Sequence, residues 1–387
     1  MEYHEFHGER ISALGMGTMR LPTKDGQIDE AKTFELIDYA VEHGVNYFDT
    51  AWSYHGGESE TVTGRALARH PRERWNLASK LPGHETNPDF RPGPTFERQL
   101  QKCGVDYFDF YLLHNVCENS LPTYLDPDLR IVDYLLEQKE RGRIRHLGFS
   151  SHTRPDALRD FLDRYPACFE FVQIQLNYLD WTLQDAKSKY ALLRERGLPI
   201  VAMEPCRGGK LARPGESAEA VLKAARPEES AASWAFRYLQ PLPGVLTILS
   251  GMSTMEQVED NVRTFSEGEP LSDEERALLE EIAAGLLDPL PCTGCRYCCG
   301  GCPAGLDIPL LLSIYKDCSF AVSFTPAMEV DALPEGKRPS ACVGCGACER
   351  VCPQGIPVPE VMKKFDSLLQ KFPHWGDVCA ERAKQKT

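Results

Sequence analysis

Two copies of one cysteine motif near the end of the chain limit what this sequence can fold into more than any other feature. Both copies read C-x2-C-x2-C-x3-C-P. Each position of the first copy has a counterpart 50 residues later, and the likeness continues to Gly305 and Gly355. The last hundred residues therefore contain an internal duplication. The motif cysteines are Cys292, Cys295, Cys298 and Cys302, followed by Cys342, Cys345, Cys348 and Cys352.

The spacing of these cysteines is typical of iron–sulfur ligation. Two-residue gaps let three successive thiolates surround one cubane, while the fourth, beyond a longer gap and before a proline, reaches the other cluster. The segment resembles a bacterial-type ferredoxin with two [4Fe-4S] clusters. Structural zinc is the alternative, but zinc sites commonly pair two well-separated C-x2-C units. The expected ligand sets are Cys292, Cys295, Cys298 and Cys352 for one cluster, and Cys342, Cys345, Cys348 and Cys302 for the other.

Cysteines are scarce elsewhere, since only four of the 15 precede residue 286. The start, MEYHEFHGER, lacks the basic and apolar regions of a secretory signal. We therefore expect a cytoplasmic protein, in which clustered cysteines bind metal more often than they form disulfides. Seven cysteines have no ligand role and are expected to be buried apolar side chains. A reactive role is the alternative for Cys117 and Cys206.

Charge and hydropathy exclude several classes of partner. The chain has 57 acidic and 43 basic residues, and a net charge of −14 repels nucleic acid. No apolar run approaches the roughly 18 residues that a membrane span requires. The excess negative charge lies in residues 1–285, whereas residues 286–387 are balanced. Because 387 residues exceed one small domain, we expect two domains, divided after residue 285.

Residues 1–285 alternate between short β-rich runs and helical patterns. The runs are GVNYFDT, RWNLASKL, VDYFDFYLLH, IRHLGFS, FVQIQLNYL, LPIVAMEP and GVLTILSG, and a strand near ISALGMGTM would complete eight. Segments between them, such as AKTFELIDYAVEHG, carry apolar residues at helical spacing. This alternation predicts an α/β fold, a (β/α)8 or TIM barrel. The second domain is expected to be small and mainly α, because a proline-led apolar helix follows each cysteine motif.

Polar residues follow several predicted strands, where the functional site of such a barrel lies. Asp49 ends NYFD, Tyr54 stands five residues later, Lys80 ends NLASK and His114 ends FYLLH. These four residues, with the surrounding segments FDTAWSYHGGE, ASKLP and YFDFYLLHN, resemble the catalytic tetrad of the aldo-keto reductases. The resemblance covers nearly all of residues 8–265. It implies an oxidoreductase that moves a hydride between a nicotinamide and a small carbonyl or alcohol.

Carbonyl reduction gives each residue of this tetrad a chemical role. A hydride that reaches a carbonyl carbon leaves negative charge on the oxygen, so a proton donor must face that oxygen. Tyr54 would donate the proton, and the ammonium of Lys80 would lower the tyrosine pKa from about 10. Asp49 would hold Lys80, and His114 would orient the oxygen or share in proton transfer.

The resemblance also implies where the nicotinamide binds. Its carboxamide is expected at Ser150, Ser151 and Gln175. Its ring is expected beside Met203, where many family members have an aromatic side chain. No G-x-G-x-x-G motif follows a strand, so the cofactor is implied by the resemblance alone.

The far end of the cofactor is expected on the segment LSGMSTMEQVEDN. The positions that commonly carry lysine and arginine for a 2′-phosphate hold Gly251 and Gln257, which favours NAD(H) over NADP(H), although an arginine from another loop could replace them. The expected contacts with the diphosphate and adenosine are Gly251, Ser253, Thr254 and Asn261.

The two halves together predict an enzyme whose clusters link the barrel to a one-electron carrier such as ferredoxin or flavodoxin. A hydride carries two electrons and each cluster accepts one, so exchange requires a mediator or two closely timed steps. Flavin could mediate, although no motif indicates it. The alternatives are a nicotinamide-binding redox sensor or electron-transfer protein with regulatory clusters, and clusters that only stabilise the second domain.

Overall fold

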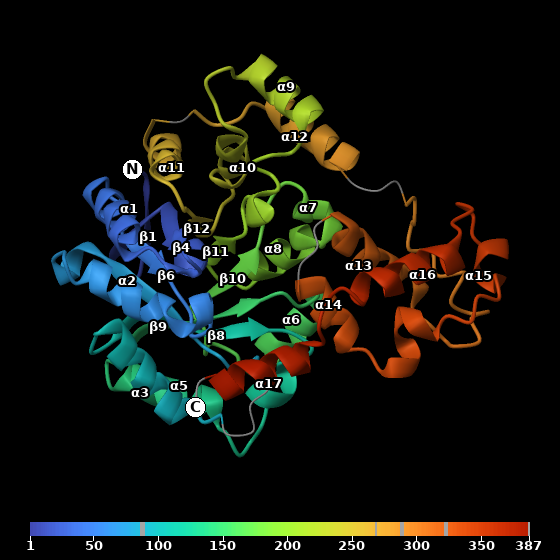
Figure 1. The fold of residues 1–387 in the computed structure, drawn as a ribbon, viewed down its shortest axis with the longest axis horizontal. Helices are drawn as coiled ribbons and strands as arrows, with labels where there is room; N and C mark the ends of the chain where they lie inside the picture. Colours follow the sequence, from blue (N-terminus) through green and yellow to red (C-terminus); the bar gives the residue numbers. More distant parts are fainter. Residues whose placement is uncertain (86–89, 268, 287–289, 321–323, 386–387) are drawn as a thin grey trace. The chain divides into compact units, whose positions relative to one another are not determined.

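The computed structural model describes residues 1–85, 90–267, 269–286, 290–320 and 324–385 and divides into two compact units (Figure 1). The first unit is Met1–Glu280 and the second is Glu281–Thr387. The division falls inside helix α12 (Asp273–Leu286), a few residues before the domain boundary that the sequence predicts. Among the described helices, none has the length and apolar character needed to cross a bilayer.

The first unit is built around eight parallel strands that close into a barrel. Successive barrel strands pair with one another, and the last, β12, pairs with the first, β3. This arrangement confirms the predicted (β/α)8 fold, including the strand expected near ISALGMGTM. The strands are β3 (Leu14–Gly17), β6 (Tyr47–Asp49), β7 (Asn76–Leu81), β8 (Phe108–Val116), β9 (Ile144–Ser151), β10 (Phe171–Gln175), β11 (Ile200–Met203) and β12 (Val245–Gly251).

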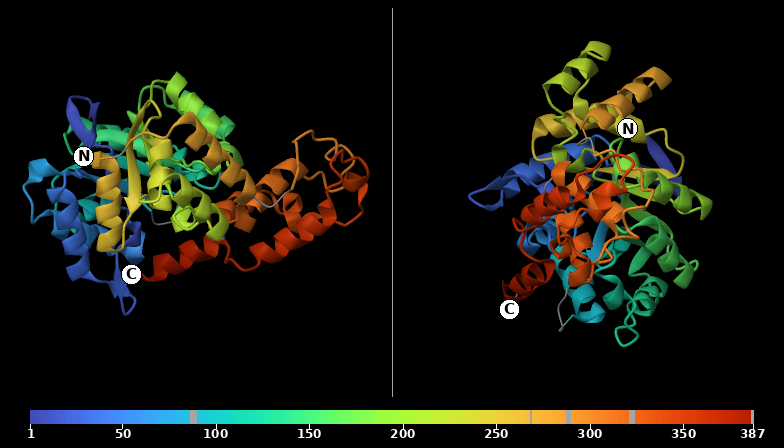
Figure 2. Two further views of the ribbon diagram at one scale, coloured as in Figure 1. Left: turned by 90° about the horizontal axis from the view of Figure 1, so that it is seen from above. Right: turned by 90° about the vertical axis from the view of Figure 1, so that its right-hand side faces the viewer.

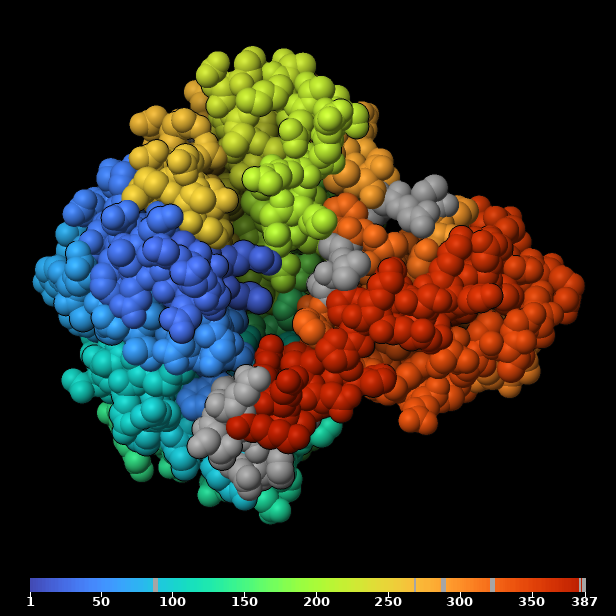
Figure 3. All heavy atoms as spheres, viewed as in Figure 1, coloured from blue at the N-terminus to red at the C-terminus, as the bar shows by residue number. Residues whose placement is uncertain are grey.

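Helices follow the barrel strands and surround them (Figures 1 and 2). Helix α9 (Glu216–Ala225) lies on the outer surface of this unit, where only Ala218 and Leu222 are buried (Figure 3). Short helices α4 (Leu121–Tyr124) and α7 (Asp180–Leu183) follow β8 and β10. The main helices are α1 (Glu30–Glu42), α2 (Ser59–Leu67), α3 (Pro92–Cys103), α5 (Ile131–Glu140), α6 (Pro155–Arg164), α8 (Ala186–Glu195), α10 (Ala231–Leu239) and α11 (Met255–Glu267).

Local signals start and end these helices. The side chain of Asp29 accepts a hydrogen bond from the backbone N of Lys32 and so caps the start of α1. Proline at position 92 begins α3, where its missing N–H costs no hydrogen bond. Gly104 ends α3 with a φ of 65°, a conformation that glycine adopts without steric cost. Helix boundaries in this unit therefore follow from residue type.

A two-stranded hairpin, β1 (Tyr3–Phe6) and β2 (Glu9–Ser12), covers the end of the barrel where the strands begin. Phe6 packs on Phe110 and Phe171, with ring centroids 5.7 and 6.3 Å apart. These rings belong to one buried cluster with Ile11 and Tyr47. Apolar packing therefore closes the interior of the barrel at this end.

The second unit is mainly helical, as predicted. Helices α13 (Ile308–Phe320) and α16 (Val358–Leu369) each follow one cysteine motif, and they contact each other. Their apolar faces meet in a buried core that includes Leu312, Met362 and Phe365. The remaining helices of this unit are α14 (Phe324–Asp331), α15 (Ala347–Arg350) and α17 (Trp375–Gln385).

Candidate functional site

Three residues of the tetrad lie near the carboxyl ends of neighbouring strands. Asp49 is the last residue of β6, Lys80 lies one residue before the end of β7, and His114 lies near the end of β8. Tyr54 begins a short 3-10 turn, Tyr54–Gly57, in the connection that follows β6. Because parallel strands all end at the same edge of the barrel, the four side chains come together at one mouth.

The ammonium group of Lys80 is the centre of this group. Its Nζ donates a hydrogen bond to Oδ1 of Asp49 over 2.5 Å and another to the carbonyl oxygen of Thr50 over 2.8 Å. The same Nζ lies 3.4 Å from the hydroxyl oxygen of Tyr54. The Lys80 side chain is fully buried. A buried charge requires such partners, since its desolvation alone costs several kcal/mol.

Burial and charge act on the tetrad in opposite directions. Burial raises the pKa of Tyr54 above its ordinary value of 10, Lys80 lowers it, and Asp49 raises it again. Burial lowers the pKa of Lys80, but the charges and hydrogen bonds of Asp49 and Tyr54 together outweigh this and the net direction is upward. The sequence argument expected the ammonium to lower the tyrosine pKa, and in the structure burial outweighs that effect. Burial was absent from that argument because exposure depends on the tertiary structure.

Aromatic neighbours surround His114. Its ring centroid lies 5.9 Å from that of Tyr54 and 4.3 Å from that of His84, both in edge arrangements. The hydroxyl of Tyr124 lies 2.6 Å from the carbonyl oxygen of His114 and 3.1 Å from that of Leu81, so it joins the ends of β8 and β7. Sequence reasoning missed His84, although it follows β7 by only three residues.

A buried polar network supports Lys80 from behind. Gln99 on α3 donates to the carbonyl oxygen of Lys80 over 3.0 Å and to Glu60 over 2.5 Å. Glu60 on α2 also accepts from Ser79 over 2.6 Å and pairs with Lys102 over 2.7 Å. The sequence did not single out these residues, because they belong to separate elements and no motif links them.

The residues expected at the nicotinamide lie on β9, β10 and β11. Ser150 accepts a hydrogen bond from the backbone of β8, and Ser151 donates one to it, each over 2.8 Å. Gln175 donates from Nε2 to Asp180 over 2.7 Å. Met203 is partly exposed at the end of β11. A carboxamide bound here would have to share or replace some of these protein hydrogen bonds.

The segment expected at the diphosphate and adenosine joins β12 to α11. The side chain of Gln257 accepts a hydrogen bond from the backbone N of Ser253 over 2.7 Å, and the hydroxyl of Thr254 accepts one from the backbone N of Gln257 over 3.4 Å. Asn261 is buried and donates to the hydroxyl of Ser250 over 2.9 Å. Gln257 and Asn261 therefore hold the start of the helix against the strand.

Arg20 is a cation at the mouth that the sequence argument did not place. It lies at the end of the turn that follows β3. A Cβ on Gly251 would lie 3.2 Å from the Arg20 side chain, and a Cβ on Gly208 would lie 3.0 Å from its Nη2. The carbonyl oxygen of Arg20 accepts a hydrogen bond from the hydroxyl of Ser253 over 2.6 Å. An exposed guanidinium beside two glycines suits an anionic group such as a diphosphate.

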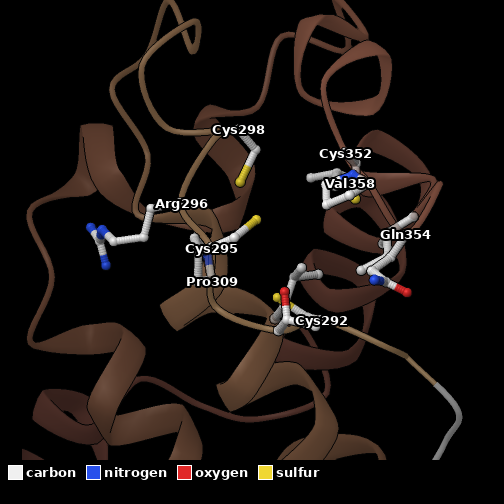
Figure 4. A pocket seen from close by; sticks show the side chains of 12 residues that line it. Cys292, Cys295, Arg296, Cys298, Pro309, Cys352, Gln354 and Val358 are labelled. Atoms are coloured by element: carbon white, nitrogen blue, oxygen red, sulfur yellow. The ribbon is translucent and has the colours of Figure 1, made fainter.

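The second unit gathers the eight motif cysteines around two cavities. Figure 4 shows the first cavity, with the sulfur atoms of Cys295 and Cys298 directed into it. Each cavity combines three cysteines of one motif with the fourth of the other. Donor sets of four cysteines suit [4Fe-4S] clusters. The first cavity has Cys292, Cys295, Cys298 and Cys352, and the second has Cys302, Cys342, Cys345 and Cys348.

The remaining cysteines are mostly shielded from solvent. Burial raises the pKa of Cys117 and raises that of Cys206 to about 12. A thiol with a raised pKa stays protonated at neutral pH and is a poor nucleophile. These directions disfavour the reactive alternative for the two residues. The buried members of this set are Cys103, Cys117, Cys318 and Cys379, whereas Cys168, Cys206 and Cys299 are partly exposed.

The fold defines a (β/α)8-barrel protein joined to a small helical unit whose eight motif cysteines line two cavities. Residues 13–284 match the aldo/keto reductase family, and residues 291–356 match the 4Fe-4S dicluster domain. The chain therefore belongs to the aldo/keto reductase family and carries a ferredoxin-like domain, as the sequence predicts.

Known relatives match about seven tenths of this chain. The NADH-specific methylglyoxal reductase of Escherichia coli is 27% identical over 71% of this chain and 96% of its own length. The L-galactose dehydrogenase of Arabidopsis thaliana is 25% identical over 73% of this chain and 92% of its own. Among solved structures, the aldo-keto reductase AKR11C1 of Bacillus halodurans in its holo form is 27% identical, with a TM-score of 0.59, over 73% of this chain and 96% of its own.

Proposed function

We propose that the barrel interconverts a carbonyl compound and an alcohol with a nicotinamide cofactor. One observation carries the proposal: the buried ammonium of Lys80 lies 2.5 Å from Asp49 and 3.4 Å from the hydroxyl of Tyr54. A phenol beside a buried ammonium can give up its proton because the phenolate that remains is stabilised.

Each residue of the tetrad then has a role. A bound reduced nicotinamide supplies the hydride. Tyr54 donates its proton to the carbonyl oxygen as negative charge develops there, and Lys80 stabilises the phenolate that is left. Asp49 keeps Lys80 charged, and His114 orients the substrate oxygen. In alcohol oxidation the same groups act in reverse, with the phenolate accepting the proton.

We propose NAD(H) as the preferred cofactor. Gly251 and Gln257 offer no charge to a 2′-phosphate, whereas Arg20 can neutralise the diphosphate that both cofactors share. The name of the E. coli relative, NADH-specific methylglyoxal reductase, supports the same cofactor and a small carbonyl substrate. The proposed contacts with the cofactor are Arg20, Ser150, Ser151, Gln175, Met203, Gly251, Ser253, Thr254 and Asn261.

We propose that the four cysteines around each cavity hold one [4Fe-4S] cluster and that the clusters carry electrons. Three exposed apolar side chains adjoin ligand cysteines: Tyr297 is 69% exposed, Val343 is 70% exposed and Val351 is 49% exposed. Exposed apolar groups favour contact with another protein, which supports a carrier such as ferredoxin or flavodoxin as the partner. Eight thiolates also require a reducing compartment, which supports a cytoplasmic location.

The test is an anaerobic assay on protein with both clusters in place. NADH or NADPH is mixed with a panel of small aldehydes and quinones that includes methylglyoxal, and cofactor absorbance is followed together with the visible absorbance of the clusters. Oxidation of NADH that depends on both the carbonyl and Tyr54 supports the proposal for the barrel. Bleaching of the clusters by NADH supports electron transfer, and no oxidation of either cofactor with any carbonyl contradicts the barrel proposal.

A further inference from the structure

Two imidazoles and a carboxylate meet at the end of the barrel where the strands begin, opposite the tetrad. His7 lies in the turn of the β1–β2 hairpin, His146 lies near the start of β9, and Glu170 directly precedes β10. One donor atom from each residue lies within 4.8 Å of the other two. None of these residues has a role in the proposed reaction.

The distances around Oε1 of Glu170 suit a tetrahedral metal site. This oxygen lies 3.5 Å from Nε2 of His7 and 3.3 Å from Nδ1 of His146. Zinc bonds to imidazole nitrogen and carboxylate oxygen measure about 2.0–2.2 Å, so tetrahedral donors lie about 3.3–3.5 Å apart. Both separations fall in that range, and rotation of the half-exposed His7 side chain can adjust the third.

The other oxygen of Glu170 is held by the protein. Its Oε2 accepts hydrogen bonds from the ammonium of Lys139 over 2.5 Å and from the backbone N of Leu147 over 3.0 Å. This arrangement fixes the carboxylate and leaves Oε1 facing the two imidazoles. Lys139 and Arg145 are cations that oppose a metal here: Lys139 lies on the Oε2 side of the carboxylate, and Arg145 lies 3.7 Å from Oε1 of Glu9.

The two ring nitrogens of His146 face different carboxylates, Nδ1 facing Glu170 and Nε2 facing Glu9. His146 is only 7% exposed, and its Nε2 is buried without a hydrogen-bond partner. The acceptor that faces this nitrogen is Oε1 of Glu9, at 3.9 Å. A histidine that ligates metal through one nitrogen commonly donates from the other to a carboxylate. In His146, Nδ1 would bind the metal and Nε2 would donate its proton to Glu9.

The backbone of His7 has a positive φ. Phe6 pairs with Glu9 across a two-residue turn in which His7 has a φ of 49° and Gly8 a φ of 84°. Turns with two positive φ values favour Asn-Gly or Asp-Gly, and histidine also adopts this backbone region more readily than most residues. Its ring stacks on that of His146, with centroids 5.3 Å apart. The turn therefore places the His7 ring against that of His146.

We propose that His7, His146 and Glu170 bind a divalent transition-metal ion, with zinc the best match to two imidazoles and a carboxylate. The fourth position is open to water, because His7 is on the surface. The ion would join the hairpin to the starts of β9 and β10 and so stabilise the closed end of the barrel. It would be separate from the two iron–sulfur clusters and from hydride chemistry.

The experiment uses the full chain with both clusters assembled and adventitious metal removed. Equilibrium dialysis against Zn²⁺, followed by elemental analysis, should give one zinc per chain with iron unchanged. His146→Gln should lose this zinc. His7→Asn should also lose it while keeping the hairpin, because asparagine suits the turn. Glu9→Gln should weaken zinc binding roughly 10- to 100-fold, as expected for a residue that orients a ligand.

Two variants serve as controls. His4→Ala removes a histidine of the same hairpin whose Nδ1 already bonds the carbonyl oxygen of Leu246. His70→Ala removes a histidine whose Nε2 pairs with Asp38. Both should keep one zinc per chain. Zinc that is retained by His7→Asn and His146→Gln, or that enters only as iron is released, would overturn the proposal, as would a wild-type chain that binds no zinc at micromolar concentrations.

Discussion

The Nζ atom of Lys80 donates a hydrogen bond to Oδ1 of Asp49 over 2.5 Å, and solvent reaches almost none of either side chain. The pair places a cation within 3.4 Å of the Tyr54 hydroxyl. A buried ion pair contributes little net stability, because desolvation offsets the attraction. Its presence at the barrel mouth is therefore better explained by the charge it presents to Tyr54 than by stability.

Replacing Tyr54 with phenylalanine should remove the proton donor and keep the ring. General acid catalysis contributes roughly 10² to 10⁴ in rate, so the barrier to carbonyl reduction should rise by about 3 to 5 kcal/mol. Steady-state turnover with an accepted aldehyde measures the effect. Cofactor affinity and cluster content should stay unchanged, and wild-type turnover in this variant would contradict the proposed mechanism.

Replacing Lys80 with methionine should lower both activity and stability. Reduction requires a protonated Tyr54, so activity falls as pH rises through the pKa of Tyr54. Lys80 lowers that pKa, so its loss should move the basic limb of the pH profile to higher pH. Removing one member of a buried ion pair costs about 3 to 5 kcal/mol, which a lower melting temperature would report.

A conservative control distinguishes charge from packing at this position. Lys80→Arg keeps the positive charge, but it cannot keep the position of Nζ between Asp49 and Tyr54. It should retain more stability than Lys80→Met, with a pH profile closer to that of the wild type. A basic limb that does not move in Lys80→Met would show that the ammonium does not tune Tyr54.

Arg20 should contribute to the binding of both nicotinamide cofactors. Its guanidinium lies beside Gly251 and Gly208, where the shared diphosphate is proposed to bind. Arg20→Gln should weaken the binding of NADH and of NADPH by similar factors, about tenfold or more. This is the effect expected for loss of a charge-assisted hydrogen bond. Direct titration measures both affinities. Selective weakening of NADPH would instead place Arg20 at the 2′-phosphate and contradict the preference for NAD(H).

The second unit should contain two clusters with crossed ligand sets. Anaerobic analysis should give about eight irons and eight sulfides per chain. Cys352→Ala should remove a ligand from the cavity of the first motif, and Cys302→Ala should do so for the second. Each variant should lose or convert one cluster, which electron paramagnetic resonance of the reduced protein can resolve. Four irons in the wild type, or stoichiometric zinc in place of iron, would contradict the assignment.

Removing the partly exposed Cys299 provides the matched control for the cluster variants. It lies inside the first motif but does not line either cavity. Cys299→Ala should keep about eight irons per chain and an unchanged spectrum. A loss of iron as large as that of Cys352→Ala would show that the ligand sets were assigned wrongly.

The local sequence pattern predicted the fold and much of the candidate site. Strand ends such as NYFD, NLASK and FYLLH mark Asp49, Lys80 and His114, because a barrel site lies where parallel strands end. The doubled cysteine motif predicted a small helical unit for clusters, because ligand spacing is a property of a short stretch of chain. Both features depend on residues that are close together in the sequence. The sequence by itself therefore determined the barrel, the helical second unit and the candidate tetrad.

Only the tertiary structure decided how these groups are buried and what else lies beside them. Burial raises the pKa of Tyr54 above its ordinary value. That burial depends on the packing of distant segments of the chain. Arg20 meets Gly251, and His7 meets Glu170, across chain separations that no motif spans. Desolvation and contacts between distant residues arise from the path of the whole chain, whereas periodicity and spacing reflect only neighbours in sequence.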